Sequence, residues 1–237
     1  MAVRAASHKQ ARLAPEGKEW LPGREYALGA IIGGQGGEGR NSVVFRIQLL
    51  DSSGAPRRRG GQAPVEYALK MVVHLVGERR QDRAGHDRST QLARHTGAEW
   101  REPLQLPPHE CLVPVLHHYH SATPKLRNYV DPMLRDAVAD KTLFLVMPLY
   151  EKGSLRSFIE ARQRQHPHPP YGLGWVWFGN LLLRMCRAVG HLIAADEIHG
   201  DIKDDNFFID DDGGVVLGDF GTAWALLDED GVELRLT

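Results

Sequence analysis

A lysine within an apolar run and a glycine-rich segment ahead of it form the first pattern with chemical meaning. Lys70 stands in Ala68-Leu-Lys-Met-Val72, where a charged side chain needs an anion or a route to solvent. The preceding Gly33-Gly-Gln-Gly-Gly-Glu-Gly39 includes Gly37 and Gly39, whose lack of side chains would let backbone N–H groups approach phosphate oxygens closely. Glycines also simply turn hairpins, so the segment by itself leaves two interpretations open. Lys70 favours the phosphate site.

The elements that must position these residues are strands followed by helices. Apolar and β-branched runs predict five strands, at residues 26–32, 42–47, 65–73, 112–119 and 142–147. The first two would form a hairpin around the glycines. A polar helix is predicted over residues 88–102 and an insertion over 121–140.

Helical sequence follows the last of these strands. A short helix is predicted to open at Gly153-Ser-Leu155 and a long core-facing helix to cover residues 178–195. The apolar stripe of the long helix comprises Phe178, Leu181, Leu182, Met185, Val189, Leu192 and Ile193. Cys186 is interpreted as a packing thiol beside this stripe. Two short strands are predicted on either side of the turn at residues 210–214. The expected fold class is therefore α+β.

Two further segments carry a spaced set of polar side chains. His199-Gly-Asp-Ile-Lys-Asp-Asp-Asn206 places Asn206 five residues after Asp201, and Asp219-Phe-Gly221 begins eighteen residues after Asp201. Together with the lysine strand, these segments resemble the H-R-D-x-K-x-x-N and D-F-G motifs of eukaryotic-type protein kinases. The resemblance covers about residues 26–221 and implies a bilobal fold, with a five-stranded antiparallel N-lobe sheet, a helix C and a partial helical C-lobe.

The resemblance implies a site for ATP and Mg²⁺ between the lobes. Lys70 takes the place of the lysine that holds the α- and β-phosphates. Its helix partner would be Glu99, with Glu102 as the alternative and Glu78 less favoured. The residues that would enclose the nucleotide are Gly37, Gly39, Val44, Ala68, Met147, Tyr150 and Phe208. Among these, Met147 matches the gatekeeper, and the residue 150 N–H would bond the adenine.

The remaining motif residues acquire roles by the same resemblance. Asn206 and Asp219 would hold the metal ion. Asp201 would orient and deprotonate the acceptor hydroxyl, and Lys203 would steady the transferring phosphoryl group. Because Lys203 lies two residues after the base, the pattern favours serine and threonine acceptors. The implied function is ATP-dependent phosphorylation of a protein substrate.

The resemblance also predicts the domain organisation. Residues 1–24 would be an N-terminal extension, 25–147 the N-lobe, and 148–237 the hinge and an incomplete C-lobe. Gly200 replaces the arginine of H-R-D, and Ser42 replaces the third glycine of the glycine loop. The chain stops at Thr237 without an A-P-E segment, so it is interpreted as a fragment. Its altered loops resemble those of divergent kinases, including apicomplexan rhoptry kinases.

Two rival functions remain open at this point. The first is a pseudokinase, which would bind nucleotide or act allosterically without transferring phosphate. The second is a small-molecule kinase of the same fold, since aminoglycoside-type kinases also use an H-G-D loop. Retention of Lys70, Asp201, Asn206 and Asp219 favours an active enzyme over the first, and the intact Asp-Phe-Gly and Gly-Ser-Leu segments favour a protein kinase over the second.

Composition excludes several other classes. The 29 basic and 30 acidic residues give a formal charge of −1, which creates no bulk attraction to nucleic acid or anionic lipid. No apolar run approaches the ~20 residues of a membrane helix, and the first 24 residues lack the centre of a secretory signal. Cys111 and Cys186 are predicted to be buried thiols in a reducing, cytoplasmic compartment.

Overall fold

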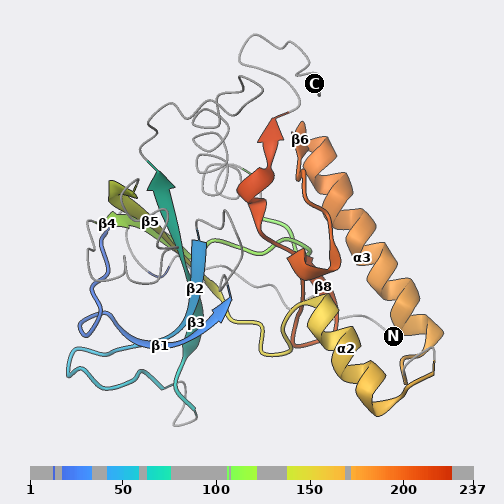
Figure 1. Cartoon of the computed structure of the whole chain (residues 1–237), viewed down its shortest axis with the longest axis horizontal. Helices are drawn as coiled ribbons and strands as arrows, with labels where there is room; N and C mark the ends of the chain where they lie inside the picture. The colour runs from blue at the N-terminus through green and yellow to red at the C-terminus, as the bar shows by residue number, and fades with distance from the viewer. Residues whose placement is uncertain are drawn as a thin grey trace, which may run out of the picture.

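A five-stranded sheet lies beside a part made of two helices and two short strand pairs (Figure 1). The computed structural model describes residues 13, 18–33, 42–58, 63–75, 106, 108–121, 138–168 and 172–225. In the order of their pairing, the strands of the large sheet are β1 (Tyr26–Gly33), β2 (Ser42–Leu49), β3 (Glu66–Leu75), β5 (Val138–Pro148) and β4 (His117–Ser121). All neighbours run antiparallel, which confirms the predicted sheet.

The sheet has one face that packs into a core and one that turns toward the helical part. Along β2, buried residues alternate with half-buried ones, as expected for a strand with one face in a core. The core residues are Trp20, Tyr26, Val43, Phe45, Ile47, Leu49, Leu69, Met71, Tyr119, Phe144 and Val146. The opposite face carries Val44 and Lys70, which are directly paired across β2 and β3. Ala68 and Met147 pair in the same way across β3 and β5.

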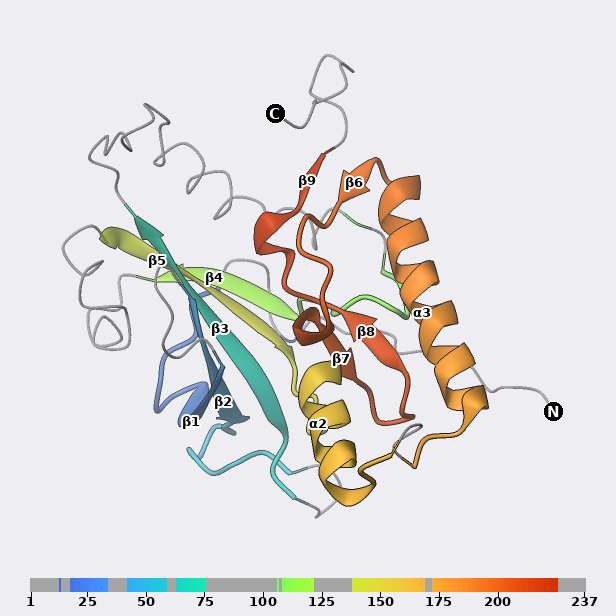
Figure 2. The same ribbon diagram turned by 45° about the vertical axis from the view of Figure 1, so that its right-hand side comes forward.

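The helical part follows the sheet along the chain. Its elements are α2 (Leu155–Gln165), α3 (Trp175–Ala194), β6 (Glu197–Ile198), η3 (Asp204–Asn206), β7 (Phe207–Ile209), β8 (Val215–Leu217), η4 (Phe220–Thr222) and β9 (Trp224–Ala225). β7 pairs with β8 and β6 pairs with β9. Ser154 caps α2, because its hydroxyl accepts a hydrogen bond from the Ser157 N–H. Figure 2 shows β7 and β8 lying between the large sheet and α3.

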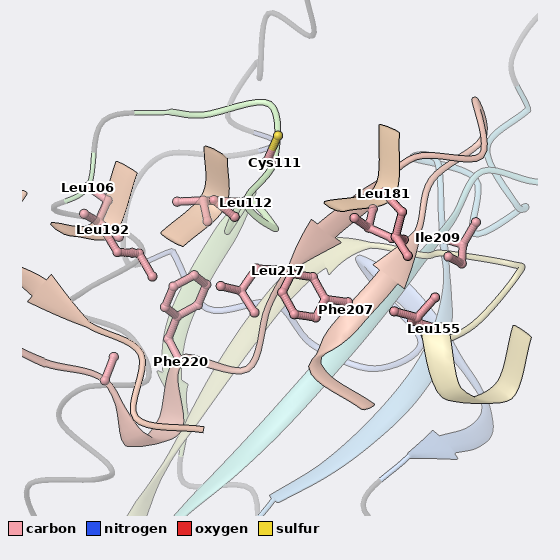
Figure 3. Close-up of a cluster of buried hydrophobic side chains, with 13 residues drawn as sticks. Leu106, Cys111, Leu112, Leu155, Leu181, Leu192, Phe207, Ile209, Leu217 and Phe220 are labelled. Carbon is pink, nitrogen blue, oxygen red and sulfur yellow. The ribbon is translucent and has the colours of Figure 1, made fainter. Parts of the chain in front are cut away.

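A second hydrophobic core joins these elements (Figure 3). Its buried members are Leu106, Cys111, Leu112, Leu155, Leu181, Ala188, Leu192, Phe207, Ile209, Val215, Leu217, Phe220 and Ala223. The labelled side chains in Figure 3 come from α2, α3, β7, β8, η4 and the segment before β4 that carries Leu106, Cys111 and Leu112. Phe220 of η4 lies in this core, so the segment that carries Asp219 is anchored on its C-terminal side.

Two of the predicted strand boundaries are wrong. The strand predicted from residue 112 begins at His117, because the preceding residues pair with β8 instead. The N–H of Val113 donates to the carbonyl of Leu217 (2.8 Å), whose own N–H donates to the carbonyl of Cys111 (2.8 Å). β5 begins at Val138, inside the predicted insertion, because the longer β3 reaches Leu75 and pairs with it there.

The burial predicted for the long helix is also corrected. α3 begins at Trp175, three residues before the predicted start. Leu182 is 60% exposed and Ile193 is 58% exposed, because the second core meets only one side of the wide apolar stripe. Cys186 is exposed, so the prediction of a packing thiol is wrong, whereas Cys111 is buried as expected.

Several predictions fall outside the described residues. These are the helix over 88–102, the three glutamates considered as partners of Lys70 (Glu78, Glu99 and Glu102), and the glycines Gly37 and Gly39. In the part of the chain that the structure describes, no helix is long and apolar enough to cross a membrane.

Candidate active site

Lys70 and Asp219 meet between the sheet and the helical part. The Lys70 Nζ lies 2.8 Å from the Asp219 Oδ1, although 149 residues separate the two in sequence. Only 9% of the lysine side chain is exposed, against 45% of the aspartate side chain. The ammonium is therefore the member of the pair that most needs a charged partner.

The Asp219 carboxylate is held in its charged form at this position. The ammonium of Lys70 lowers the pKa of Asp219, while desolvation acts in the opposite direction. The backbone of Asp219 adopts the left-handed conformation, with φ at 63° and ψ at 66°. This conformation is strained for a residue with a Cβ, and the anchored Phe220 beyond it lies in the second core. The fold thus maintains a local geometry that aims the carboxylate at Lys70.

A second group of side chains forms at the loop before β7. The Asn206 amide Nδ2 donates to the backbone carbonyl of Asp201 (2.7 Å) and to its Oδ2 (3.0 Å). The Lys203 Nζ lies 2.5 Å from the same Oδ2. Asn206 is buried, whereas Asp201 is half-buried and Lys203 exposed. The loop therefore presents one buried anchor and two side chains that solvent or a substrate can reach.

His199 connects this loop to the segment of Asp219. Its Nε2–H donates to the carbonyl of Gly218 (2.9 Å), and its Nδ1 lies 3.4 Å from the backbone N–H of Asp201, which donates to it. The ring also lies 5.1 Å from that of Phe220. Burial lowers the pKa of His199, which favours the neutral ring that can accept one bond and donate the other. Sequence reasoning used His199 only as part of a motif and assigned it no role.

Three of the other predicted nucleotide contacts, Val44, Ala68 and Met147, fall on the face of the sheet that carries Lys70. Val44 pairs with Lys70, and Ala68, two residues before that lysine, pairs with Met147. Tyr150 leaves the end of β5 and stacks on Phe208, with ring centroids 5.7 Å apart. Four of the predicted residues (Val44, Ala68, Lys70 and Met147) therefore share one face of the large sheet, and the Tyr150–Phe208 stack joins the chain beyond β5 to β7.

Residues 126–235 match the family model for protein tyrosine and serine/threonine kinases. This part of the chain belongs to the eukaryotic-type protein kinases. Over 158 residues, 66% of the chain is 30% identical to a probable protein kinase of Dictyostelium discoideum. Over 101 residues, 43% of the chain is 32% identical to the serine/threonine-protein kinase shk2 of Schizosaccharomyces pombe. The chain spans 16% and 15% of the lengths of these two relatives. The sheet and the helical part are accordingly the two lobes of a kinase-like fold.

The donor atoms of this kinase site suit Mg²⁺ shared with a nucleotide. Asp219 offers a carboxylate, and Asn206 keeps its amide oxygen available because its side-chain hydrogen bonds to Asp201 use Nδ2. Magnesium prefers such oxygens and commonly takes one or two protein ligands together with substrate phosphates. Within the described ranges, no group of three or more His, Cys, Asp or Glu side chains could hold a metal by itself. The residues therefore fit a metal that arrives with ATP.

The replacement of the H-R-D arginine by Gly200 has a local backbone counterpart. Gly200 adopts a φ of 76°, a conformation that residues with a Cβ rarely adopt. It lies between His199 and Asp201, so the left-handed turn at this position brings the backbone N–H of Asp201 back to the Nδ1 of His199. The motif departure and the loop geometry are consistent with each other.

Proposed function

We propose that the protein is an ATP-dependent protein kinase that transfers the γ-phosphate of ATP to serine or threonine hydroxyls of a protein substrate. The observation that carries this proposal is the 2.8 Å contact between Lys70 and Asp219. A buried cation beside a carboxylate is the arrangement that binding of phosphate and Mg²⁺ requires, and this supports the proposal. Because the chain spans about a sixth of the length of its relatives, the proposal concerns the whole protein that contains it.

Lys70 and the two candidate metal ligands would bind the nucleotide. In this mechanism, Lys70 contacts the α- and β-phosphates, and Asn206 and Asp219 hold Mg²⁺. The bound ion supplies neutralisation of the phosphate charge that grows as the γ-phosphoryl group leaves. The low exposure of Lys70 strengthens its attraction for phosphate, because less water screens the charge.

Asp201 would act on the acceptor hydroxyl. Its Oδ2 is engaged by Asn206 and Lys203, which fixes the carboxylate and leaves Oδ1 to accept the hydroxyl proton. Lys203, at 2.5 Å from that carboxylate, can then contact the transferring phosphoryl group from the same side. Catalysis would depend mainly on positioning and electrostatic stabilisation.

Nucleotide binding is tested on the 237-residue chain by thermal shift with ATP and MgCl₂. We expect a Mg²⁺-dependent rise in the melting temperature of wild type that Asp219→Ala reduces strongly. Asp212→Ala removes an exposed carboxylate of the β7–β8 turn and should leave the shift unchanged. Equal shifts for wild type and Asp219→Ala would refute the assignment.

Phosphoryl transfer is tested on the full-length protein with radiolabelled ATP and a library of serine, threonine and tyrosine peptides. Asp201→Asn should lower the transfer rate by about 10²–10⁴-fold, the usual contribution of a general base, with little change in ATP affinity. Nucleotide binding without transfer by wild type would instead indicate a pseudokinase. Labelling of tyrosine peptides alone would contradict the proposed acceptor.

A further inference from the structure

Arg46 lies on the face of the sheet that carries Lys70, toward the end where β5 leads to the helical part. It lies two residues beyond Val44 on β2 and pairs directly with Ala68 on β3, which in turn pairs with Met147 on β5. Directly paired residues of neighbouring antiparallel strands project from the same face of the sheet. Arg46 therefore extends from the N-lobe over the edge where the chain leaves β5 for the helical lobe.

The Arg46 guanidinium joins carboxylates on either side of this edge. Its Nη1 donates to the Glu66 Oε2 on β3 (2.7 Å), and its Nη2 donates to the Glu151 Oε2 (2.9 Å). Gln48 fixes the first acceptor, since its Nε2 donates to the Glu66 Oε1 (2.8 Å). Glu151 follows Tyr150 directly, at the end of the connection between the lobes. One planar cation thus spans from the sheet to the start of the helical lobe.

The contact with Glu151 is exposed enough to open and close. The Glu151 side chain is 58% exposed and that of Arg46 is 35% exposed. Ion pairs of this exposure contribute about 0–1 kcal/mol, because water screens the charges. Such a contact can bias the distance between the lobes without locking it. Its partner contact with Glu66 keeps the guanidinium in place when the lobes separate.

We propose that Arg46 is a positioning residue that latches the N-lobe to Glu151 beside the proposed nucleotide site and slows nucleotide release. The inference rests on the nucleotide site proposed above. In this proposal, a nucleotide bound beside Ala68 leaves past the edge that this ion pair crosses. Breaking the pair therefore acts on the dissociation rate more than on the association rate.

The test measures the dissociation of a fluorescent nucleotide, N-methylanthraniloyl-ADP with Mg²⁺, by stopped flow on the 237-residue chain. The variants are Arg46→Gln, Glu151→Gln and the double variant. We expect each single variant to raise the dissociation rate about two- to fivefold, as loss of an exposed ion pair implies. The double variant should match the single ones, since both changes remove the same contact. Raising the salt concentration should shrink the difference from wild type.

Controls separate the latch from general effects on stability. Arg24→Gln removes an exposed arginine whose ion pair lies within the N-lobe (3.5 Å to Glu25), and it should leave the dissociation rate unchanged. The melting temperature without nucleotide should change little in any of these variants. Unchanged dissociation rates in Arg46→Gln, or fully additive effects in the double variant, would overturn the latch while the nucleotide site stands. Failure of wild type to bind the nucleotide would overturn the proposed function, and the latch with it.

Discussion

Trp20 offers the sharpest test of the fold, because its burial has no local signal in the sequence. It precedes β1 in a segment that sequence reasoning treated as an extension, yet only 5% of it is exposed. Its ring lies 4.8 Å from the ring of His117, whose Nε2–H donates to the carbonyl of Lys18 (2.7 Å). Trp20, which lies before β1, therefore packs against His117 of β4 and contributes to the first core.

Replacing Trp20 with alanine should cost about 3–5 kcal/mol of unfolding free energy, the usual range for a fully buried tryptophan. Domains are stable by about 5–15 kcal/mol, so this is a large share of the total. For a chain of this length it corresponds to a fall in melting temperature of about 6–20 °C. The matched control is Trp175→Ala, since Trp175 is 80% exposed on the first turn of α3. Its change should stay within about 0.5 kcal/mol.

The assay is urea unfolding followed by far-ultraviolet circular dichroism, which does not depend on the tryptophan that is removed. Fluorescence would report the lost probe as well as the lost stability. A loss below about 1 kcal/mol for Trp20→Ala would refute the burial of this segment, since it would fall in the range of surface substitutions. Equal losses for Trp20→Ala and Trp175→Ala would refute the reasoning from exposure.

Three further predictions concern single residues. Gly200→Ala should destabilise the protein by about 1–2 kcal/mol in thermal unfolding, because φ is 76° at this position. Gly190→Ala, in an open position inside α3, should instead stabilise it by about 0.5–1 kcal/mol. Stability changes of the same sign in the two variants would contradict the backbone assignment. Burial lowers the pKa of His117, so below pH ~6.5 the unfolded chain binds a proton that the folded chain excludes. Stability in urea should thus fall as the pH drops from 7 to 5, and an undiminished fall in His117→Gln would contradict this origin. A thiol reagent should modify the exposed Cys186 in the folded protein and the buried Cys111 only after unfolding, and simultaneous modification of the two would show that their burial is misassigned.

Local sequence was enough to predict the strands and to suggest a site. Alternation along β2 and the apolar run around Lys70 were enough to predict which segments form the sheet. The two-residue period of a strand depends only on residues that are neighbours in the sequence. The spacing of Asp201, Asn206 and Asp219 favours one site, because a short loop and a strand pair keep such positions within one segment. The roles of these residues in phosphoryl transfer stay a prediction.

The tertiary structure decided which distant residues become partners. The contact of Lys70 with Asp219, the burial of Trp20 and the bridge from Arg46 to Glu151 each join segments far apart in the chain. It also decided that Cys186 faces solvent. The apolar stripe of α3 predicts which side of the helix is apolar, but not how much of that side another element covers. Such contacts depend on strand order and on the packing of the two lobes. No local pattern records them, because periodicity reports the face of an element and not the residue that will lie against it.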